Sequence, residues 1–253
     1  MKAALLLLAG LALVAPPVPA QIDGPRSGAD FLTPDTRTLQ DDDFLNPGLF
    51  AVEEGRALWN RVEGAAGQAC ASCHAEADMR GVAARHPVFD PATGGLVDLA
   101  GRVNAMRREH MGAPELPRES QAMLALTAFL GFQSRGMPMA VEIDGPARPF
   151  FEAGREDWFR RRGQLNLSCA QCHDDLAGRR LRGDTISQGQ VNGMPFYRLM
   201  WRTMASRHRM FEWCETSLRA EPRAAGSAEY LALELYVAWR GRGLPVETPA
   251  VRR

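Results

Sequence analysis

The sequence is nearly devoid of lysine and carries no net charge. Lys2 is its only lysine, and over 253 residues 30 basic side chains balance 30 acidic ones. That balance, with 45% hydrophobic residues, excludes a disordered polymer and an electrostatic nucleic-acid binder, because both need a skewed composition. The chain should instead fold into one or two domains with a buried core. Because its cations are arginines, they have the planar shape that suits oxyanion binding.

Long apolar runs are also missing, except at the N-terminus. Residues 1–20 have one charge at Lys2, an apolar core from Ala3 to Ala15, and small residues at the end. Prolines make this stretch shorter than the roughly 20 residues of a membrane-spanning helix. We therefore predict a secretory signal peptide cleaved after Ala20, and an exported protein without a membrane span. Residues 21–48, rich in Asp, Gly and Pro, should form an extended N-terminal arm.

Period-2 runs of β-branched residues, which would indicate strands, are absent. Apolar residues instead recur at helical spacing in five segments, 49–67, 119–135, 150–164, 194–213 and 227–240. The pattern predicts an all-α fold.

The chain contains one pattern twice. Gly-Arg-x-x-Trp followed by Cys-x-x-Cys-His begins at Gly55 and again at Gly154, 99 residues later. The last apolar helices, beginning near Leu124 and Leu231, are related by an offset of 107. We infer that one module was duplicated into tandem domains, residues 49–140 and 149–253, with a Pro- and Gly-rich linker over 136–149.

Cysteine is scarce: five residues are too few for a disulfide scaffold, and their odd number leaves one unpaired. Four of them form the two Cys-x-x-Cys-His motifs, the attachment signature of haem c. A zinc site would need Cys pairs about 15–20 residues apart, and a thioredoxin-like pair would need a βαβ context. Simple disulfides would leave the histidines unexplained. We predict two cytochrome c-like domains with two covalently bound haem c groups, attached at Cys70, Cys73, Cys169 and Cys172, with His74 and His173 as iron ligands.

Each iron then needs a sixth ligand or an open face. Candidates in the first unit are Met106, His110 and Met111, and the corresponding stretch of the second unit contains Cys214. Pairing Met106 with Cys214 gives an offset of 108, one away from that of the following helices.

Cys214 is the unpaired cysteine. It could be an inert buried thiol or an intermolecular disulfide, but several arginines flank it, and cationic neighbours lower a thiol's pKa. Arg240 stands at the end of the last helix where the first unit has glutamine. It is either a helix C-terminal cation or part of a clamp for a dianionic substrate.

The second half of the chain resembles the SoxA subunit of the periplasmic sulfur-oxidation cytochrome. The resemblance rests on GQVNG at 189–193, FYR at 196–198, Cys214, RAEP at 219–222, GS at 226–227, EY at 229–230 and Arg240. It implies an L-cysteine S-thiosulfotransferase that joins thiosulfate oxidatively to a cysteine of the SoxYZ carrier. Its partner would be the monohaem cytochrome SoxX, in a heterodimer, and a c-type cytochrome would accept the electrons.

By the same resemblance, Cys214 is the active-site cysteine and an iron ligand. The arginines that the family keeps near it correspond to Arg240 and to Arg209, with Arg207 as the alternative register. Where dihaem relatives have an Asn-x-Cys-Arg pattern, this chain has methionine at position 106, which implies His74/Met106 ligation of the first haem and a higher reduction potential than His/Cys ligation would give.

Two other functions are compatible with the motifs. A plain dihaem electron carrier explains both haems and the duplication but not Cys214 or its arginines. A dihaem peroxidase would need an acid–base residue above an open iron, for which His208 is the candidate.

Overall fold

The computed structural model describes residues 24–253, so the predicted signal peptide lies outside the described part of the chain. The structure is rich in helices, as the apolar spacing predicts, but short strands connect them, and the all-α prediction is thus confirmed only in its dominant feature. Within residues 24–253, no helix is both long and apolar enough to cross a membrane.

The first half of the chain is built on helices α2 (Leu49–Asn60) and α4 (Gln121–Gln133). They approach so closely at Gly55 that a Cβ there would collide with the carbonyl of Ala125. Val52, Trp59 and Phe129 are buried in the apolar cluster between the two helices. Ser120 caps α4 by accepting a hydrogen bond from the N–H group of Met123.

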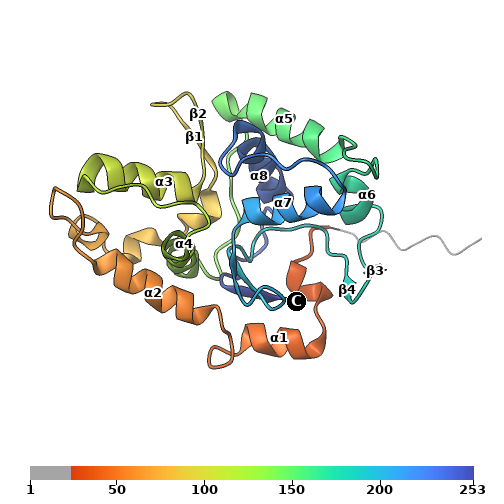
Figure 1. Ribbon diagram of the computed structural model, residues 1–253, viewed down its shortest axis with the longest axis horizontal. Coiled ribbons are helices and arrows are strands. Elements are labelled where there is room, and N and C mark those ends of the chain that lie inside the picture. Colours follow the sequence, from red (N-terminus) through yellow and green to blue (C-terminus); the bar gives the residue numbers. More distant parts are fainter. Residues whose placement is uncertain (1–23) are drawn as a thin grey trace, which may run out of the picture.

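The second half repeats this arrangement with α5 (Arg148–Phe159) and α8 (Ala228–Arg240). A Cβ at Gly154 would collide with the carbonyl of Ala232, and Ser227 caps α8 through the N–H group of Tyr230. Trp158 lies in the buried cluster of this pair, as Trp59 does in the first. The two helix pairs lie beside each other, with α4 and α8 toward the centre of the molecule (Figure 1).

The remaining elements are short. Helix α3 (Leu99–Met106) continues directly into a π-helical turn (Arg107–Met111), α6 (Cys169–His173) is one turn long, and α7 (Arg207–Ser217) lies next to α8. The hairpins are β1 (Val88–Asp90) with β2 (Gly95–Val97), and β3 (Arg180–Leu181) with β4 (Asp184–Thr185). A three-stranded sheet has the order β6 (Thr203–Ala205), β5 (Phe196–Arg198), β7 (Ala250–Arg252), with β5 parallel to β7.

The predicted helix over 194–213 is wrong in its first part, because β5 and β6 occupy it and α7 begins only at Arg207. Ser206 stops extension toward the N-terminus: its hydroxyl accepts a hydrogen bond from the N–H group of Arg209 as an N-cap. The strands form because β5 finds a partner in β7 at the far end of the chain. A window of local sequence does not contain that partner.

The N-terminal arm is not extended throughout. It contains a 3₁₀ turn (Gly28–Phe31) and helix α1 (Pro34–Asp41), which begins with Thr33 as N-cap and Pro34 at its first position. The side-chain amide of Gln40 bonds the N–H group of Val251 at 3.3 Å, and the amide of Asn46 bonds the carbonyl of Pro249 at 2.8 Å. The arm thus packs against β7, and α1 lies near the C-terminus (Figure 1).

Candidate functional site

The second Cys-x-x-Cys-His motif forms the single turn of α6. Ser168 caps it reciprocally: its hydroxyl accepts from the N–H group of Gln171 at 3.4 Å, and the Gln171 amide oxygen accepts from that of Ser168 at 2.9 Å. Helical spacing places Cys169, Cys172 and His173 on one face of this turn. Two thiols and an imidazole therefore point the same way, as a covalent haem requires.

His173 is oriented by its other ring nitrogen. Its Nδ1 lies 2.8 Å from the carbonyl oxygen of Ser187. Because a carbonyl can only accept, Nδ1 carries the proton, and the lone pair of Nε2 is left for a metal. Burial lowers the pKa of His173, which favours the neutral imidazole that binds iron.

Trp158 and Arg240 complete the surroundings of this histidine. The Trp158 ring lies 5.7 Å from the His173 ring, and its Nε1 donates to Asp174 at 2.8 Å. Arg240 stacks 4.3 Å over Trp158 and pairs with Asp174 at 2.5 Å. Its Nε is buried without a hydrogen-bond partner among the described residues. The predicted substrate arginine is thus placed beside the histidine of the motif and is already ion-paired.

The first motif is more open. Cys70 begins a 3₁₀ turn, Cys73 and His74 follow and are exposed, and the Trp59 ring lies 6.2 Å from the His74 ring. The arrangement matches that of Trp158 and His173 in the second unit. At both motifs the residues present, two thiols followed by an imidazole beside a tryptophan, fit the attachment of haem c.

The loop before each motif contacts its unit through equivalent bonds. The N–H group of Ala66 donates to the carbonyl of Met111 at 3.0 Å, and that of Leu165 donates to the carbonyl of Leu218 at 3.3 Å. The donors Ala66 and Leu165 are 99 residues apart, and the acceptors Met111 and Leu218 are 107 residues apart.

One helical turn before Met111 and Leu218, the offset between equivalent residues of the two units becomes 108. The N–H group of Ala113 bonds the carbonyl of Arg107, whereas that of Ala220 bonds the carbonyl of Glu215, each at 2.9 Å. The π-helical turn of the first unit contains one residue more than the α-helical turn of the second. Met106, which precedes Arg107, therefore occupies the position of Cys214, which precedes Glu215.

The other predicted alternatives for the first iron lie elsewhere. His110 is exposed, and Met111 is buried in the turn whose carbonyl bonds the motif loop. Met106 is half-buried at the end of α3.

Cys214 is half-buried on α7, and its electrostatic neighbours include Cys172 of the haem motif. Burial raises the pKa of the Cys214 thiol to about 11, the nearby Cys172 adds to the rise, and Arg198 opposes it. The expectation that flanking arginines lower this pKa is therefore wrong for the thiol itself. Coordination to iron would deprotonate it regardless.

The arginines near Cys214 in sequence divide into two groups in space. Arg207 faces away, toward Glu234 at 2.6 Å, and is not available to an anion. Arg209 lies over the Trp201 ring at 4.4 Å, and the ring of Trp213, next to Cys214, packs against Trp201 at 5.4 Å.

Sequence reasoning missed Arg198. Its guanidinium lies 5.5 Å from the Trp201 ring, and its positive charge acts to lower the pKa of Cys214. Its Nε is buried without a hydrogen-bond partner among the described residues. Neither Arg198 nor Arg209 has an ion pair within residues 24–253. Arg198 lies 16 residues before Cys214 and on a different element, so local sequence does not connect the two residues. The only sign in the sequence was that Arg198 belongs to the FYR segment at 196–198.

A second titratable cluster lies between the two units. Asp98, His208 and Glu234 are all buried, with possible ligand atoms within 4.8 Å of one another. His208 accepts a hydrogen bond from the N–H group of Gly226 on Nδ1, so its Nε2 carries the proton and faces Glu234 at 2.9 Å. Arg118 pairs with Asp98 and Arg207 with Glu234, so with a protonated Nε2 the cluster is an ion-pair network rather than a metal site. The bond to Glu234 also leaves His208 unsuited to a peroxidase role.

Comparison with known proteins gives a consistent result. Residues 54–139 match the family described as SoxA/TsdA, cytochrome c domain. The chain is 46% identical over 242 residues to the L-cysteine S-thiosulfotransferase subunit SoxA of Rhodovulum sulfidophilum, covering 93% of this chain and 84% of that protein. It is 43% identical over 230 residues to the subunit of the same name from Pseudaminobacter salicylatoxidans, covering 90% and 80%.

A solved structure is similar over nearly the whole chain. It is the crystal structure of SoxXA from P. pantotrophus, with a TM-score of 0.89 and 44% identity, covering 92% of this chain and 89% of the other.

Proposed function

The chain belongs to the family of SoxA subunits of L-cysteine S-thiosulfotransferase, and from that premise we propose that it holds two covalent haem c groups and carries out the sulfur chemistry at Cys214. It is a cytochrome c-domain protein and an enzyme subunit whose partner is a SoxX cytochrome. The periplasm is the proposed location, since the sequence begins with a predicted signal peptide.

Two tandem cytochrome c-like domains, residues 49–140 and 149–253, form the proposed organisation. The equivalent helix contacts at Gly55 and Gly154, and the equivalent tryptophan beside each motif, support duplication of one module. His74 with Met106, and His173 with Cys214, are the proposed iron ligands. The main support for these ligands is that Met106 and Cys214 occupy the same position of the repeat.

The proposed reaction joins thiosulfate to a cysteine of a SoxYZ-like carrier. The sulfane sulfur of thiosulfate forms a bond with the Cys214 sulfur, and two electrons are lost. The carrier thiolate then attacks that sulfane sulfur, so the bond to Cys214 breaks and a carrier S–S–SO₃⁻ group forms. In sum, a thiol and thiosulfate yield the conjugate, one proton and two electrons. A bound haem supplies the one-electron acceptor, and a c-type cytochrome takes the electrons onward.

The protein's own contribution is to hold the dianion beside the Cys214 sulfur. Arg209 and Arg198, which contact the same Trp201 ring, are the proposed anion-binding residues. Arg240, the other residue predicted for this role, pairs with Asp174 beside His173 and would have to leave that pair to contact the dianion. Guanidinium groups bind such oxyanions through paired N–H donors.

Replacing the active cysteine tests this proposal. In the complex with its partner cytochrome, Cys214→Ser should lower thiosulfate conjugation by at least ~10³-fold. Mass spectrometry should still find two attached haems, because the attachment cysteines are unchanged. Low-temperature EPR of Cys214→Ala should lack a low-spin thiolate-type signal present in the wild type. Full turnover and identical spectra would favour a plain dihaem electron carrier.

A further inference from the structure

The loop that orients His173 has little structure of its own. Residues 186–195 connect β4 to β5 without helix or strand, and their first part, residues 186–193, lies against His173. The carbonyl of Ser187 accepts the bond from His173 Nδ1, and the carbonyl of Gln188 accepts one from Arg240 at 3.3 Å. Gly189 lies so close that a Cβ there would come within 3.1 Å of the His173 ring. The position of this loop therefore sets the geometry of the histidine.

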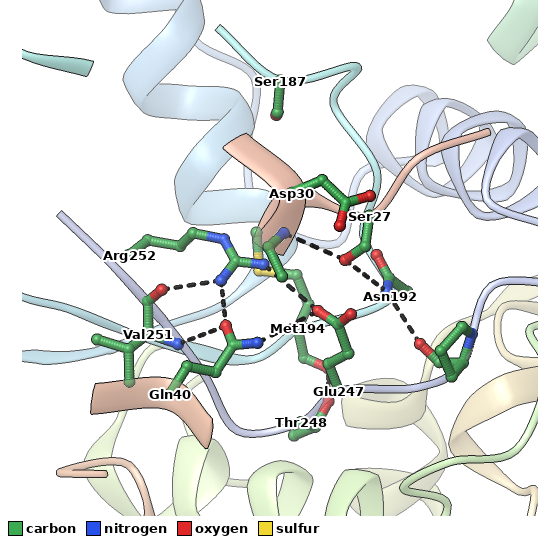
Figure 2. A network of polar contacts seen from close by, with 12 residues as sticks. Ser27, Asp30, Gln40, Ser187, Asn192, Met194, Glu247, Thr248, Val251 and Arg252 are labelled. Carbon is green, nitrogen blue, oxygen red and sulfur yellow. Dashed lines mark hydrogen bonds and ion pairs between the residues drawn. The ribbon is translucent and has the colours of Figure 1, made fainter. Parts of the chain in front are cut away.

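The N-terminal arm holds this loop from the other side. The amide of Gln188 forms two bonds with the arm backbone: its oxygen accepts from the N–H group of Arg26 at 2.6 Å, and its nitrogen donates to the carbonyl of Gly24 at 3.1 Å. Asn192, which is 1% exposed, donates to the hydroxyl of Ser27 at 3.2 Å, and Figure 2 shows this contact. Three positions of the arm, Gly24, Arg26 and Ser27, are thus bound to the histidine loop.

The arm is itself anchored farther along. Gln40 bonds Val251 and Arg252 of β7, and Arg252 also lies 3.8 Å from Glu247 (Figure 2). This second anchor does not touch residues 186–189. The contacts of the arm with the loop and with the sheet can therefore be tested separately.

We propose that residues 24–28 of the arm are a positioning element for the iron ligand His173, acting through Gln188 and Asn192. They hold the 186–193 loop so that the Ser187 carbonyl stays in line with Nδ1. Such a bond increases the basicity of a histidine ligand and fixes its tautomer. A basic ligand stabilises ferric iron, so the arm keeps the reduction potential of the second haem low. This inference rests on the proposed haem at the second motif.

The test compares three variants of the full mature chain. Gln188→Ala removes both side-chain bonds to the arm, deletion of residues 21–28 removes the arm's contact with the loop, and Gln40→Ala is the control at the other anchor. Redox potentiometry followed by EPR would give the potential of each haem, with the first haem as an internal reference.

We expect Gln188→Ala and the deletion to raise the potential of the second haem and to change its low-spin EPR signal, because the bond to His173 lengthens. The first haem should be unaffected in both variants, and both haems should be unaffected in Gln40→Ala. An unshifted second haem in the two test variants would overturn the proposal while leaving the two-haem assignment intact. Equal shifts at both haems would also overturn it, since they would indicate general loosening. A wild-type protein without a haem at the second motif would overturn both this inference and the two-haem assignment.

Discussion

At the scale of single residues, the two units preserve an ion pair with its charges exchanged. Glu63 pairs with Arg107 at 2.5 Å in the first unit, and Arg162 lies 3.7 Å from Glu215 in the second. The acid and the base have changed places, but each pair ties the loop before a haem motif to the residue after a proposed iron ligand. The pair holds Met106 and Cys214 at the same place relative to their motifs. The two proposed iron sites therefore differ in the type of side chain at that place, a thioether in one and a thiol in the other.

The proposed iron ligand Met106 can be tested by exchanging it. Met106→Cys should lower the reduction potential of the first haem, because thiolate stabilises ferric iron more than a thioether does. Potentiometry would measure the shift, with the second haem as reference. His110→Ala and Met111→Leu are the controls, and a change of ligation in either one instead would identify a different ligand.

Arg198 should contribute to thiosulfate binding. Arg198→Ala removes a guanidinium near Cys214 and should raise the apparent KM for thiosulfate by about 10-fold or more, the usual effect of losing a hydrogen bond to a charged group. Because the residue binds rather than reacts, kcat should fall less than kcat/KM. Arg198→Lys should recover part of the loss, since it keeps the charge without the fork. Arg180→Ala, on the exposed strand β3, is the control, and an equal KM change there would point to bulk electrostatics.

At the scale of elements, each of the two units depends on one close crossing of two helices. Gly55 against α4 and Gly154 against α8 leave no room for a side chain, because the neighbouring carbonyl lies where a Cβ would be. The close approach brings Trp59 and Trp158 onto their histidines. The packing of the two helices therefore also determines where each tryptophan lies against the histidine of its motif.

Filling either crossing should destabilise the protein. Gly154→Ala should cost about 1–3 kcal/mol or more of unfolding free energy, because the backbone of α8 must move. Gly55→Ala should behave similarly in the first unit. Gly95→Ala is the control, since its nearest neighbour would be 3.9 Å away. Thermal unfolding followed by circular dichroism would test this, and a neutral Gly154→Ala would mean that the helices separate readily.

At the scale of the whole molecule, buried charges join the two units. Arg207 bonds the carbonyl of His86 at 3.3 Å and pairs with Glu234, while Ser206 bonds Glu119. The contact between the units therefore contains buried polar groups as well as apolar side chains.

The ionised Glu234 side chain should make the free energy of unfolding depend on pH in the acidic range. Its burial alone would raise the pKa of the carboxyl, but Arg207 and the hydrogen bond from His208 lower it to about 2. A depressed pKa stabilises the fold above the unfolded pKa of about 4.3, and this contribution disappears as pH falls toward 2. It amounts to roughly 3 kcal/mol between about pH 5 and about pH 2.

Urea unfolding of wild type and Glu234→Gln at several pH values would measure this contribution. The variant should be less stable at neutral pH by about 3–5 kcal/mol, since it leaves Arg207 unpaired. The difference between the two proteins should shrink as the pH is lowered below 4.5. A difference that stays constant with pH would show that Glu234 is not ionised in the native protein.

The sequence alone determined the haem motifs, the repeat and four of the five main helices, because each of these depends on residues close together in the chain. Cys-x-x-Cys-His is complete within five positions, and an apolar period is visible within one helix. Even the offset of 108 between Met106 and Cys214 was readable, although not its cause.

Only the tertiary structure decided which distant groups meet. It showed that a π-helical turn explains the offset, that Arg207 belongs to Glu234, and that Arg198 lies near Cys214. It also placed the arm on the His173 loop and paired β5 with β7, so that residues 196–205 are strands rather than helix. The reason is common to all of them: an arginine, an amide or a strand edge bonds whichever partner the packing brings near, and that partner can lie anywhere in the sequence.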